Sequence, residues 1–585
     1  MTVGDFIVER LRDWGVKQVF AYPGDGINGI VAAFGKADND PAFIQTRHEE
    51  MAAFAAVGFA KFSGDVGVCL ATSGPGAIHL LNGLYDAKLD HVPVVAIVGQ
   101  TARTAQGGSY QQEVDLHSLF RDVASFLIDV NVPEQLPNAL DRAMRTAAAD
   151  RAPAVLIIPN DVQEQDYEAP KHEFKYIPSS PPSRPSSCVV PANDEVRRAA
   201  DVLNTGEKVA ILIGQGARGA ASEVREVAEM LGAGVAKALL GKDVLPDDLP
   251  YVTGSIGLLG TRPSYEMMRD CDRLLIVGSN FPYSQYLPKF GKARGVQIDV
   301  DGRAIGMRYP TEVNLVGDAR ETLRALIPLL ERKNDRSWRH TIEANVERWW
   351  EVVEKQASVP ADPVNPMLIV SELSKRLPAN AIVTADSGSA TNWYARLLRI
   401  HGNVRSSLSG TLATMGCAVP YALGAAYAQP KRPLIALVGD GAMQMNGMAE
   451  LLTLKRYGVR CVVCVFHNND LNQVTWELRA MGGAPKFEES QTLPDISYAD
   501  YARSIGLQGI EVDKPDQLGP AWETALASDG TVVLDVRCDP NVPPIPPHAT
   551  FDQIKDMTEA VLRGDPDAWG LMSRGIKTKI QELLP

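Results

Sequence analysis

The chain has 585 residues, which is too long for a single hydrophobic core, so several domains are expected. Hydrophobic residues make up 45% and charged residues 22%, a composition typical of a soluble globular protein. The formal net charge of -13 argues against non-specific binding to nucleic acid, because an acidic surface repels phosphates.

The N-terminus and the cysteines narrow the class of protein further. Residues 1–12 lack a basic stretch followed by an apolar one, and no apolar stretch reaches membrane-spanning length, so a cytoplasmic protein is expected. The seven cysteines are an odd number and are scattered, which argues against a disulfide scaffold. Cys461 and Cys464 form a CxxC, but they lie in an apolar run, which favours core packing over redox or zinc chemistry.

Two changes in composition divide the chain. Residues 170–191 are rich in Pro and Ser and predict a linker. Residues 331–366 are charged, contain tryptophans that indicate a helix, and end in prolines. The predicted units are residues 1–170, 191–330 and 361–545, followed by a tail over 546–585.

Short apolar runs alternate with helical patterns in all three units. Runs of this length between helices indicate parallel sheets covered on both faces, so each unit is predicted to be a doubly wound α/β domain. In such sheets ligands bind beyond the carboxyl ends of the strands. The runs cover residues 66–70, 94–98 and 155–158, then 209–213, 274–277 and 296–298, and finally 434–438, 462–466 and 532–534.

In the first unit, polar and glycine-rich turns surround these runs. Tyr22 to Gly26 form an early turn, and Ser73 to Gly76 read Ser-Gly-Pro-Gly after the run 66–70. Arg47-His48-Glu49-Glu50 precedes an alanine-rich helix. Acidic residues at a helix start complement the helix dipole, which is sufficient to explain Glu50.

In the second unit, glycines follow the run 209–213 as Gly214-Gln215-Gly216, with Arg218 close behind. Asn280 and Phe281 follow the next run, and Asp299 follows the third. A glycine cluster of this kind is a weak signal by itself.

In the third unit, the run 434–438 leads into Gly439-Asp440-Gly441, and the run 462–466 leads into His467-Asn468-Asn469. Two neighbouring strand ends could thus supply a carboxylate and an amide oxygen to one ion, and oxygen ligands are what Mg²⁺ prefers. Each turn alone is common, whereas the pair is specific.

The pair resembles the signature of thiamine-diphosphate enzymes, and so does the intervening Met443-Gln444-Met445-Asn446. The likeness extends from about Thr2 to Pro547 and is to the pyruvate oxidase and acetolactate synthase branch. It implies a pyrimidine-binding domain, a central FAD-type domain and a diphosphate-binding domain, with thiamine diphosphate and Mg²⁺ as cofactors.

The resemblance implies roles for residues of the third unit. Metal ligands are Asp440, Asn468 and the main-chain carbonyl of Asp470. A literal reading of the motif gives Asn469 instead, but the family has a leucine three residues after the ligand, and Leu471 stands three after Asn468. Further cofactor contacts are expected from Ser387, Ser389, Ala413, Met415, Gly439, Gly441 and Ala442, with Met415 supporting the bent cofactor.

For the first unit, the resemblance implies that Glu49 is the carboxyl that relays a proton to the aminopyrimidine ring. Gly24 and Ser73 are expected near the cofactor. In the family this glutamate and the metal site come from different subunits, so a homodimer or homotetramer is expected.

For the second unit, the resemblance favours bound FAD, although family members without flavin keep the same domain fold. The expected contacts are Gly214, Gly216, Arg218, Asn280, Phe281 and Asp299.

The expected substrate is a small 2-oxo acid. Gln112 and Glu477 match catalytic positions that face the reacting intermediate. Gln111 and Gln473 stand where pyruvate oxidases usually have phenylalanines around the substrate methyl. Two amides make the pocket more polar, so a substrate with hydroxyl, carboxylate or amide groups is predicted rather than pyruvate.

The implied function is decarboxylation of a 2-oxo acid with electron transfer to FAD. The alternative is an acetolactate synthase-like carboligase or a non-oxidative decarboxylase. A non-catalytic scaffold is disfavoured, because Glu49, Asp440 and Asn468 are all present. The tail over 546–585 is expected to act as a lid or subunit contact rather than in peripheral membrane binding.

Overall fold

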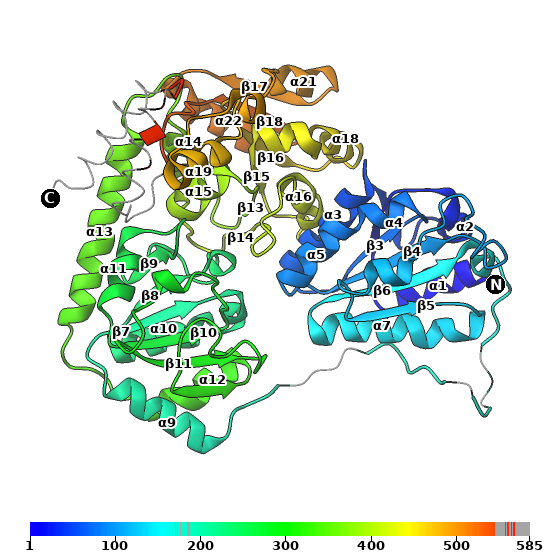
Figure 1. The fold of residues 1–585 in the computed structure, drawn as a ribbon, viewed down its shortest axis with the longest axis horizontal. Coiled ribbons are helices and arrows are strands. Elements are labelled where there is room, and N and C mark those ends of the chain that lie inside the picture. The colour runs from blue at the N-terminus through cyan, green and yellow to red at the C-terminus, as the bar shows by residue number, and fades with distance from the viewer. Residues whose placement is uncertain are drawn as a thin grey trace.

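The computed structural model describes residues 1–169, 171, 173–175, 177–183 and 188–544, and beyond these residues 556, 559, 560, 563 and 565–567. Within these residues the strands form three six-stranded sheets in which every pairing is parallel. Helices flank each sheet, so the predicted α/β class with three doubly wound sheets is confirmed (Figure 1). We call each sheet with its helices the first, second or third domain; the predicted linker and charged stretch fall between the sheets.

The first sheet has the strand order β2-β1-β3-β4-β6-β5. Its order reverses between β1 and β3, and such a switch point is where doubly wound sheets bind ligands. The strands are β1 (Gln18–Ala21), β2 (Ala42–Gln45), β3 (Gly67–Ala71), β4 (Val94–Gln100), β5 (Phe126–Asp129) and β6 (Pro153–Pro159). The helices are α1 (Val3–Asp13), α2 (Asn28–Lys36), α3 (Glu49–Ser63), α4 (Pro75–His79), α5 (Leu81–Leu89), α6 (Leu116–Phe120), α7 (Leu136–Asp150) and α8 (Asn160–Gln163).

The second sheet has the order β12-β11-β10-β7-β8-β9, which is the order of the dinucleotide-binding doubly wound fold. Its switch point lies between β7 and β10. The strands are β7 (Val209–Ile213), β8 (Gly234–Lys237), β9 (Val252–Ser255), β10 (Arg273–Val277), β11 (Arg294–Asp299) and β12 (Val313–Val316). The helices are α9 (Asn193–Asn204), α10 (Ala221–Leu231), α11 (Arg262–Asp270) and α12 (Ala319–Leu326).

The third sheet has the order β14-β13-β15-β16-β18-β17, which repeats the topology of the first. The strands are β13 (Ile382–Ala385), β14 (Arg405–Ser407), β15 (Leu434–Gly439), β16 (Cys461–His467), β17 (Gln508–Val512) and β18 (Val532–Arg537). The helices are α14 (Pro366–Arg376), α15 (Ser389–Leu397), α16 (Ala418–Ala428), α17 (Asp440–Ala442), α18 (Met448–Arg456), α19 (Asn472–Gly482), α20 (Glu488–Gln491), α21 (Tyr498–Ser504) and α22 (Leu518–Ala527).

The charged stretch after the second sheet contains α13 (Ser337–Ala357), as the tryptophans predicted. This helix runs from the second domain to the third and packs on α11 and α14 (Figure 1). Trp349 is buried on its inner face, and Arg339 lies 4.1 Å from the ring centroid of Tyr251. The helix is therefore a spacer between two sheets rather than a solvated linker.

The first and third domains meet where α3 packs against α16 (Figure 1). A side chain at Gly424 would lie 2.1 Å from the carbonyl oxygen of Ala55, and one at Gly58 would lie 2.6 Å from the Cα of Tyr421. The two helices thus approach more closely than any residue larger than glycine permits at these points.

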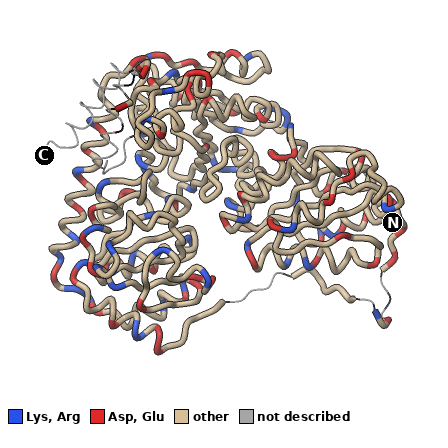
Figure 2. The backbone as a smooth tube through the Cα atoms, viewed as in Figure 1, with Lys and Arg blue, Asp and Glu red and all other residues tan. Residues whose placement is uncertain are grey.

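Charged residues of both signs are interspersed over all three domains (Figure 2). Cys461 and Cys464 are buried on β16, as the apolar run predicted. None of the helices in the described part of the chain combines the length and apolar character that a membrane crossing requires.

We expect Gly424→Ala to lower stability by about 1–3 kcal/mol, because overpacking forces the two helices apart. Gly35 in α2 is the matched control, since a side chain there would meet nothing within 4 Å. Gly35→Ala should be neutral or stabilise the protein by up to about 1 kcal/mol through helix propensity. The midpoint of thermal unfolding measures both effects, and equal midpoints for the two variants would contradict the packing argument.

Candidate functional site

The carboxylate of Asp440 is the centre of the predicted metal site. It follows β15 and is 3% exposed. Oδ2 accepts hydrogen bonds from the backbone N–H groups of Asn468 at 2.7 Å and Asn469 at 2.6 Å, and Oδ1 accepts from Gly441 at 2.9 Å. Burial raises the pKa of Asp440 to about 6, against the lowering effect of these three N–H groups. The structure therefore brings the two predicted strand ends together around one buried carboxylate.

The loop after β16 presents its two asparagines differently. Asn468 Oδ1 accepts from the N–H of Asp470 at 3.0 Å, while the backbone N–H of Asn468 bonds to Asp440. Asn469 has a φ of 55°, and its Oδ1 lies 2.9 Å from His467 Nε2. The Asp470 side chain is bonded to Thr475 and Lys486. The Asn469 amide is thus taken up by His467, and Asn468 with the main-chain carbonyl of Asp470 stays the predicted ligand set.

His467 precedes the two asparagines at the end of β16, and the sequence alone gives it no role. It is 2% exposed, and its Nδ1 lies 2.8 Å from Asp535 Oδ1. Burial lowers its pKa and Asp535 raises it, with a net increase. The other oxygen of Asp535 accepts from the N–H groups of Tyr498 and Ala499. The buried contact between His467 and Asp535 thus holds the loop that carries Asn468 and Asn469.

The predicted diphosphate turn lies beside Asp440, because β13 and β15 are neighbours. Asp386 is fully buried, and its carboxylate accepts from the N–H groups of Ser387, Gly416 and Ala418. Ser387 Oγ is buried with no hydrogen-bond partner, and Ser389 begins α15. A helix N-terminus with an unpartnered hydroxyl beside it suits a phosphate oxygen.

The turn that carries Asp440 and the turn that carries Ser387 enclose a space that we call the cradle. Two glycines keep this cradle open. A side chain at Gly439 or Gly388 would meet nothing within 4 Å, and Gly388 has a φ of 107°. A side chain at Gly441 would lie 2.6 Å from Leu471 Cδ2, so the Leu471 side chain would have to shift to admit one. Ala442 is buried in the short helix α17, which continues through a π-helical turn containing Asn446. Both amide atoms of Asn446 are buried and unpartnered.

The loop 408–416 carries Ala413 and Met415. Ala413 has a φ of 54°, and the Met415 methyl lies 3.3 Å from the side-chain position of Gly441. Met415 therefore lies directly over the metal turn, as a support for a bent cofactor requires.

A buried ion pair fixes this loop to the first domain. Lys61 Nζ lies 2.6 Å from both Asp90 Oδ2 and the carbonyl of Leu408. Asp90 also accepts from the N–H groups of Gly410 and Thr411 at 2.9 and 2.8 Å.

Glu49 begins α3 in the first domain and is 7% exposed. Its Oε2 lies 2.9 Å from His79 Nδ1, and the His79 ring stacks on His48 with centroids 4.3 Å apart. Oε1 lies 3.2 Å from the side-chain position of Gly76. The carboxyl is thus held on one oxygen, while glycine leaves room beside the other.

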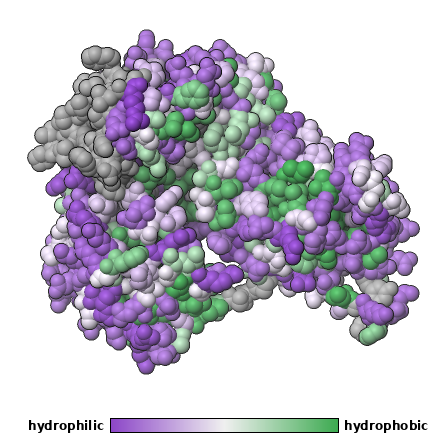
Figure 3. All heavy atoms as spheres, viewed as in Figure 1, coloured by the Kyte–Doolittle hydropathy of each residue, from purple (hydrophilic) through white to green (hydrophobic). Residues whose placement is uncertain are grey.

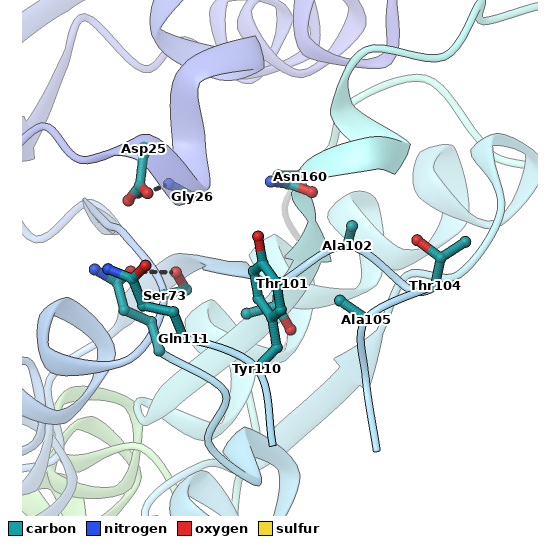
Figure 4. Close-up of a pocket in the computed structure, with 11 residues that line it drawn as sticks. Asp25, Gly26, Ser73, Thr101, Ala102, Thr104, Ala105, Tyr110, Gln111 and Asn160 are labelled. Carbon is teal, nitrogen blue, oxygen red and sulfur yellow. Dashed lines mark hydrogen bonds between the residues drawn. The ribbon is translucent and has the colours of Figure 1, made fainter. Parts of the chain in front are cut away.

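A cavity of about 360 Å³ lies at the switch point of the first sheet (Figure 4). Its lining comes wholly from the first domain and includes Asp25, Gly26, Ser73, Gln111 and Gln112. Ser73 Oγ donates to Gln112 Oε1 at 2.9 Å. Gly24 lies beside this turn, packed on Thr72.

The predicted flavin residues meet at the switch point of the second sheet. Gly214 and Gly216 pack against Gly278: a side chain at Gly214 would lie 2.2 Å from the Gly278 carbonyl. Arg218 pairs with the buried Asp243 at 3.0 Å. Asn280 is exposed and Phe281 buried after β10, and Asp299 ends β11, where burial raises its pKa.

The two glutamines that are predicted to line the substrate pocket lie in different domains and in different surroundings. Gln111 is exposed in the first-domain cavity. Gln473, in the first turn of α19, accepts from Asn392 Nδ2 at 2.5 Å and donates to Glu477 at 2.9 Å. Asn392 was missed in the sequence, because helix α15 mixes polar and apolar residues and nothing in it singles out this asparagine.

Most of the predicted tail lies outside the described residues. Its described residue Asp565 forms a buried ion pair with Arg479 at 2.8 Å, on the same helix as Gln473 and Glu477.

The structure is thus a three-domain α/β protein in which the predicted metal and diphosphate turns lie side by side. Three family models match it: "Thiamine pyrophosphate enzyme, N-terminal TPP binding domain" over residues 1–119, the central domain over 196–326, and the C-terminal TPP binding domain over 386–536.

Relatives agree over nearly the whole chain. A putative thiamine pyrophosphate-containing protein, YdaP, of Bacillus subtilis is 38% identical over 96% of this chain and 96% of its own. A probable acetolactate synthase large subunit of Methanocaldococcus jannaschii is 31% identical over 95% of each chain. The pyruvate oxidase of Lactiplantibacillus plantarum is 30% identical over 91% of this chain and 88% of its own. The chain therefore belongs to the thiamine pyrophosphate enzyme family, in the branch that the sequence predicted.

We expect Asn468→Ala to weaken Mg²⁺-dependent binding of thiamine diphosphate at least about tenfold, because it removes a ligand oxygen. Asn469→Gly is the matched variant, since glycine tolerates the positive φ at this position. It should weaken binding less, because the Asn469 amide bonds to His467. Titration followed by tryptophan fluorescence measures both. Loss of binding in Asn469→Gly with binding retained in Asn468→Ala would reverse the assignment.

Mg²⁺ affinity should also depend on pH through Asp440, whose pKa is raised to about 6. A proton and the cation compete for this carboxylate, so affinity should rise about tenfold per pH unit up to about pH 6 and level off above it. In the metal-free protein the pH dependence of stability has the opposite sign. Because the pKa of Asp440 is higher in the folded than in the unfolded protein, this group's contribution to stability falls as pH rises from the unfolded-state pKa to about 6. Calorimetric titration measures the affinity, and a constant affinity across this range would contradict the assignment.

Proposed function

We propose that this protein uses thiamine diphosphate and Mg²⁺ to decarboxylate a 2-oxo acid and passes the electrons to FAD. The observation that carries the proposal is the buried carboxylate of Asp440, enclosed by the loop that carries Asn468 and faced by the diphosphate turn.

The cradle fits the cofactor on the chemistry of its own atoms. The unpartnered Ser387 hydroxyl and the N-terminus of α15 suit phosphate oxygens. Asp440, the Asn468 amide and the Asp470 carbonyl are the hard oxygen ligands that Mg²⁺ takes together with phosphates. When bound, thiamine diphosphate supplies the electron sink that lets a 2-oxo acid lose carbon dioxide.

The residues around the cradle hold and move protons. Glu49 is buried and held by His79 through one oxygen, so its other oxygen can share a proton with the cofactor's aminopyrimidine. Met415 supports the cofactor from the metal-turn side. Gln112 and Glu477 would face the reacting intermediate.

Three observations support an intersubunit site. The cavity that adjoins Ser73 and Gln112 is lined by the first domain alone. Ile78 on α4, next to His79, is 44% exposed. Apolar side chains also gather on the surface where the first and third domains adjoin (Figure 3). A second copy of the chain, as a homodimer or within a homotetramer, would bring a third domain to this cavity.

FAD is proposed on the strand order of the second sheet and on the turns that meet at its switch point. Because Gly214 and Gly216 pack on Gly278, their loops come close enough for a ligand to contact the main chain there. Arg218, close behind these glycines, is paired with Asp243 at 3.0 Å.

The relatives include acetolactate synthases, which favour an alternative function without electron transfer. The protein would then be a carboligase or a non-oxidative decarboxylase. The two functions differ in whether the flavin is reduced.

The test is a panel of 2-oxo acids added without oxygen to protein saturated with thiamine diphosphate, Mg²⁺ and FAD. We expect release of carbon dioxide together with bleaching of the flavin. Glu49→Gln should lower the rate about 10²–10⁴-fold, because the proton relay is lost. Glu134→Gln, at an exposed glutamate far from the cradle, is the matched control.

Carbon dioxide without flavin bleaching would favour the carboligase or non-oxidative decarboxylase. No carbon dioxide from any 2-oxo acid would show the proposal to be wrong.

A further inference from the structure

A chain of three polar side chains crosses the edge of the third sheet beside the diphosphate cradle. It runs from Asn392 on α15 through Gln473 to Glu477 on α19. Both helices start at the cradle: α15 at Ser389, and α19 four residues after Asn468. The chain therefore lies where the reacting end of a substrate would meet the cofactor.

The chemistry of the chain sets the orientation of the Gln473 amide. A carboxylate is only an acceptor, so Gln473 must turn its NH₂ group to Glu477, at 2.9 Å. Its oxygen then faces Asn392, which must donate from Nδ2, at 2.5 Å. Asn392 is 2% exposed, so its own position is fixed by packing.

With this orientation, Gln473 has one N–H left over. In the described part of the chain, Nε2 makes a single hydrogen bond, to Glu477, and Gln473 is only partly buried. Glu477 is exposed and keeps one carboxylate oxygen outside this bond. The chain thus offers a fixed donor and an acceptor side by side.

We propose that Asn392, by orienting Gln473 against Glu477, makes the enzyme selective for 2-oxo acids that carry a hydroxyl group near the oxo carbon. A hydroxyl accepts one hydrogen bond and donates another, which matches the free N–H of Gln473 and the free oxygen of Glu477. A methyl group leaves both unpaired, and a second carboxylate is repelled by Glu477. Asn392 acts through Gln473 and is a positioning residue.

This inference rests on the proposed function and narrows its substrate class. The test compares two matched pairs by carbon dioxide release: pyruvate with 3-hydroxypyruvate, and 2-oxobutanoate with 4-hydroxy-2-oxobutanoate. 2-Oxoglutarate supplies the carboxylate arm. In the unaltered enzyme, kcat/KM should favour at least one hydroxylated member by about tenfold or more, since unpaired polar groups in a site penalise the analogue without a hydroxyl.

Three variants test the chain itself. Asn392→Val removes the donor, and Asn392→Asp replaces it with an acceptor that draws the Gln473 NH₂ away from Glu477. Gln473→Met removes the amide. Each should bring the ratio within each pair close to one while leaving Mg²⁺-dependent thiamine diphosphate binding unchanged, which shows that the cradle is intact. Asn314→Val, at an exposed position on β12, is the matched control and should keep the ratio.

The outcomes separate the two claims. Preference for the apolar members or for 2-oxoglutarate, or an unchanged ratio in Asn392→Val and Asn392→Asp, would overturn the inference and leave decarboxylation standing. Absence of carbon dioxide from every acid, in protein that binds thiamine diphosphate, would overturn the proposed function and the inference with it.

Discussion

The structure around the cradle depends on the buried pair of Lys61 and Asp90. Two charges that are almost completely removed from water are retained only when both are well paired. Lys61 also donates a hydrogen bond to the Leu408 carbonyl, and Asp90 also accepts hydrogen bonds from the N–H groups of Gly410 and Thr411. The start of the loop that carries Met415 is thereby fixed to α3 and α5 of the first domain, and Asp386 fixes its end.

This constraint explains why α3 and α16 approach so closely. The cradle has parts on two domains, and its loop can satisfy both the Asp90 and the Asp386 carboxylates only if the domains are in tight register. Gly58 and Gly424 allow the helix backbones to come into contact, and alanines fill the rest of the interface. Close packing of this kind transmits strain, so a change at the helix contact should also be felt at the loop.

The sequence predicted those strands that are buried on both faces, because burial makes them continuous apolar runs. All nine apolar runs are strands of the three sheets. The strands that were not predicted are short or mixed in character: β12 alternates buried and exposed residues at its sheet edge, and β14 has three residues, all polar. Their pairing comes from neighbouring strands, which no local pattern reveals.

The site divides in the same way. Asp440 and Asn468 follow recognisable runs, so their meeting at one edge could be predicted from parallel topology. Asn392 and Gln473 are 81 residues apart, and neither belongs to a motif. Only the fold shows that one orients the other.

The same comparison bears on how substrate choice evolves in this fold. In the proposed function the metal turn and the diphosphate turn hold parts of the cofactor that do not vary, so their residues should not change. Asn392 on α15 and Gln473 on α19 lie beside these turns and have no proposed contact with a phosphate or the metal. A pair of exchanges there can replace apolar contacts with a directed amide while the cradle is unchanged. Because a lone amide can turn its donor either way, its neighbours give it direction: Glu477 accepts from the Gln473 NH₂ group and Asn392 donates to the Gln473 oxygen, so the amide presents a donor rather than an acceptor to the substrate.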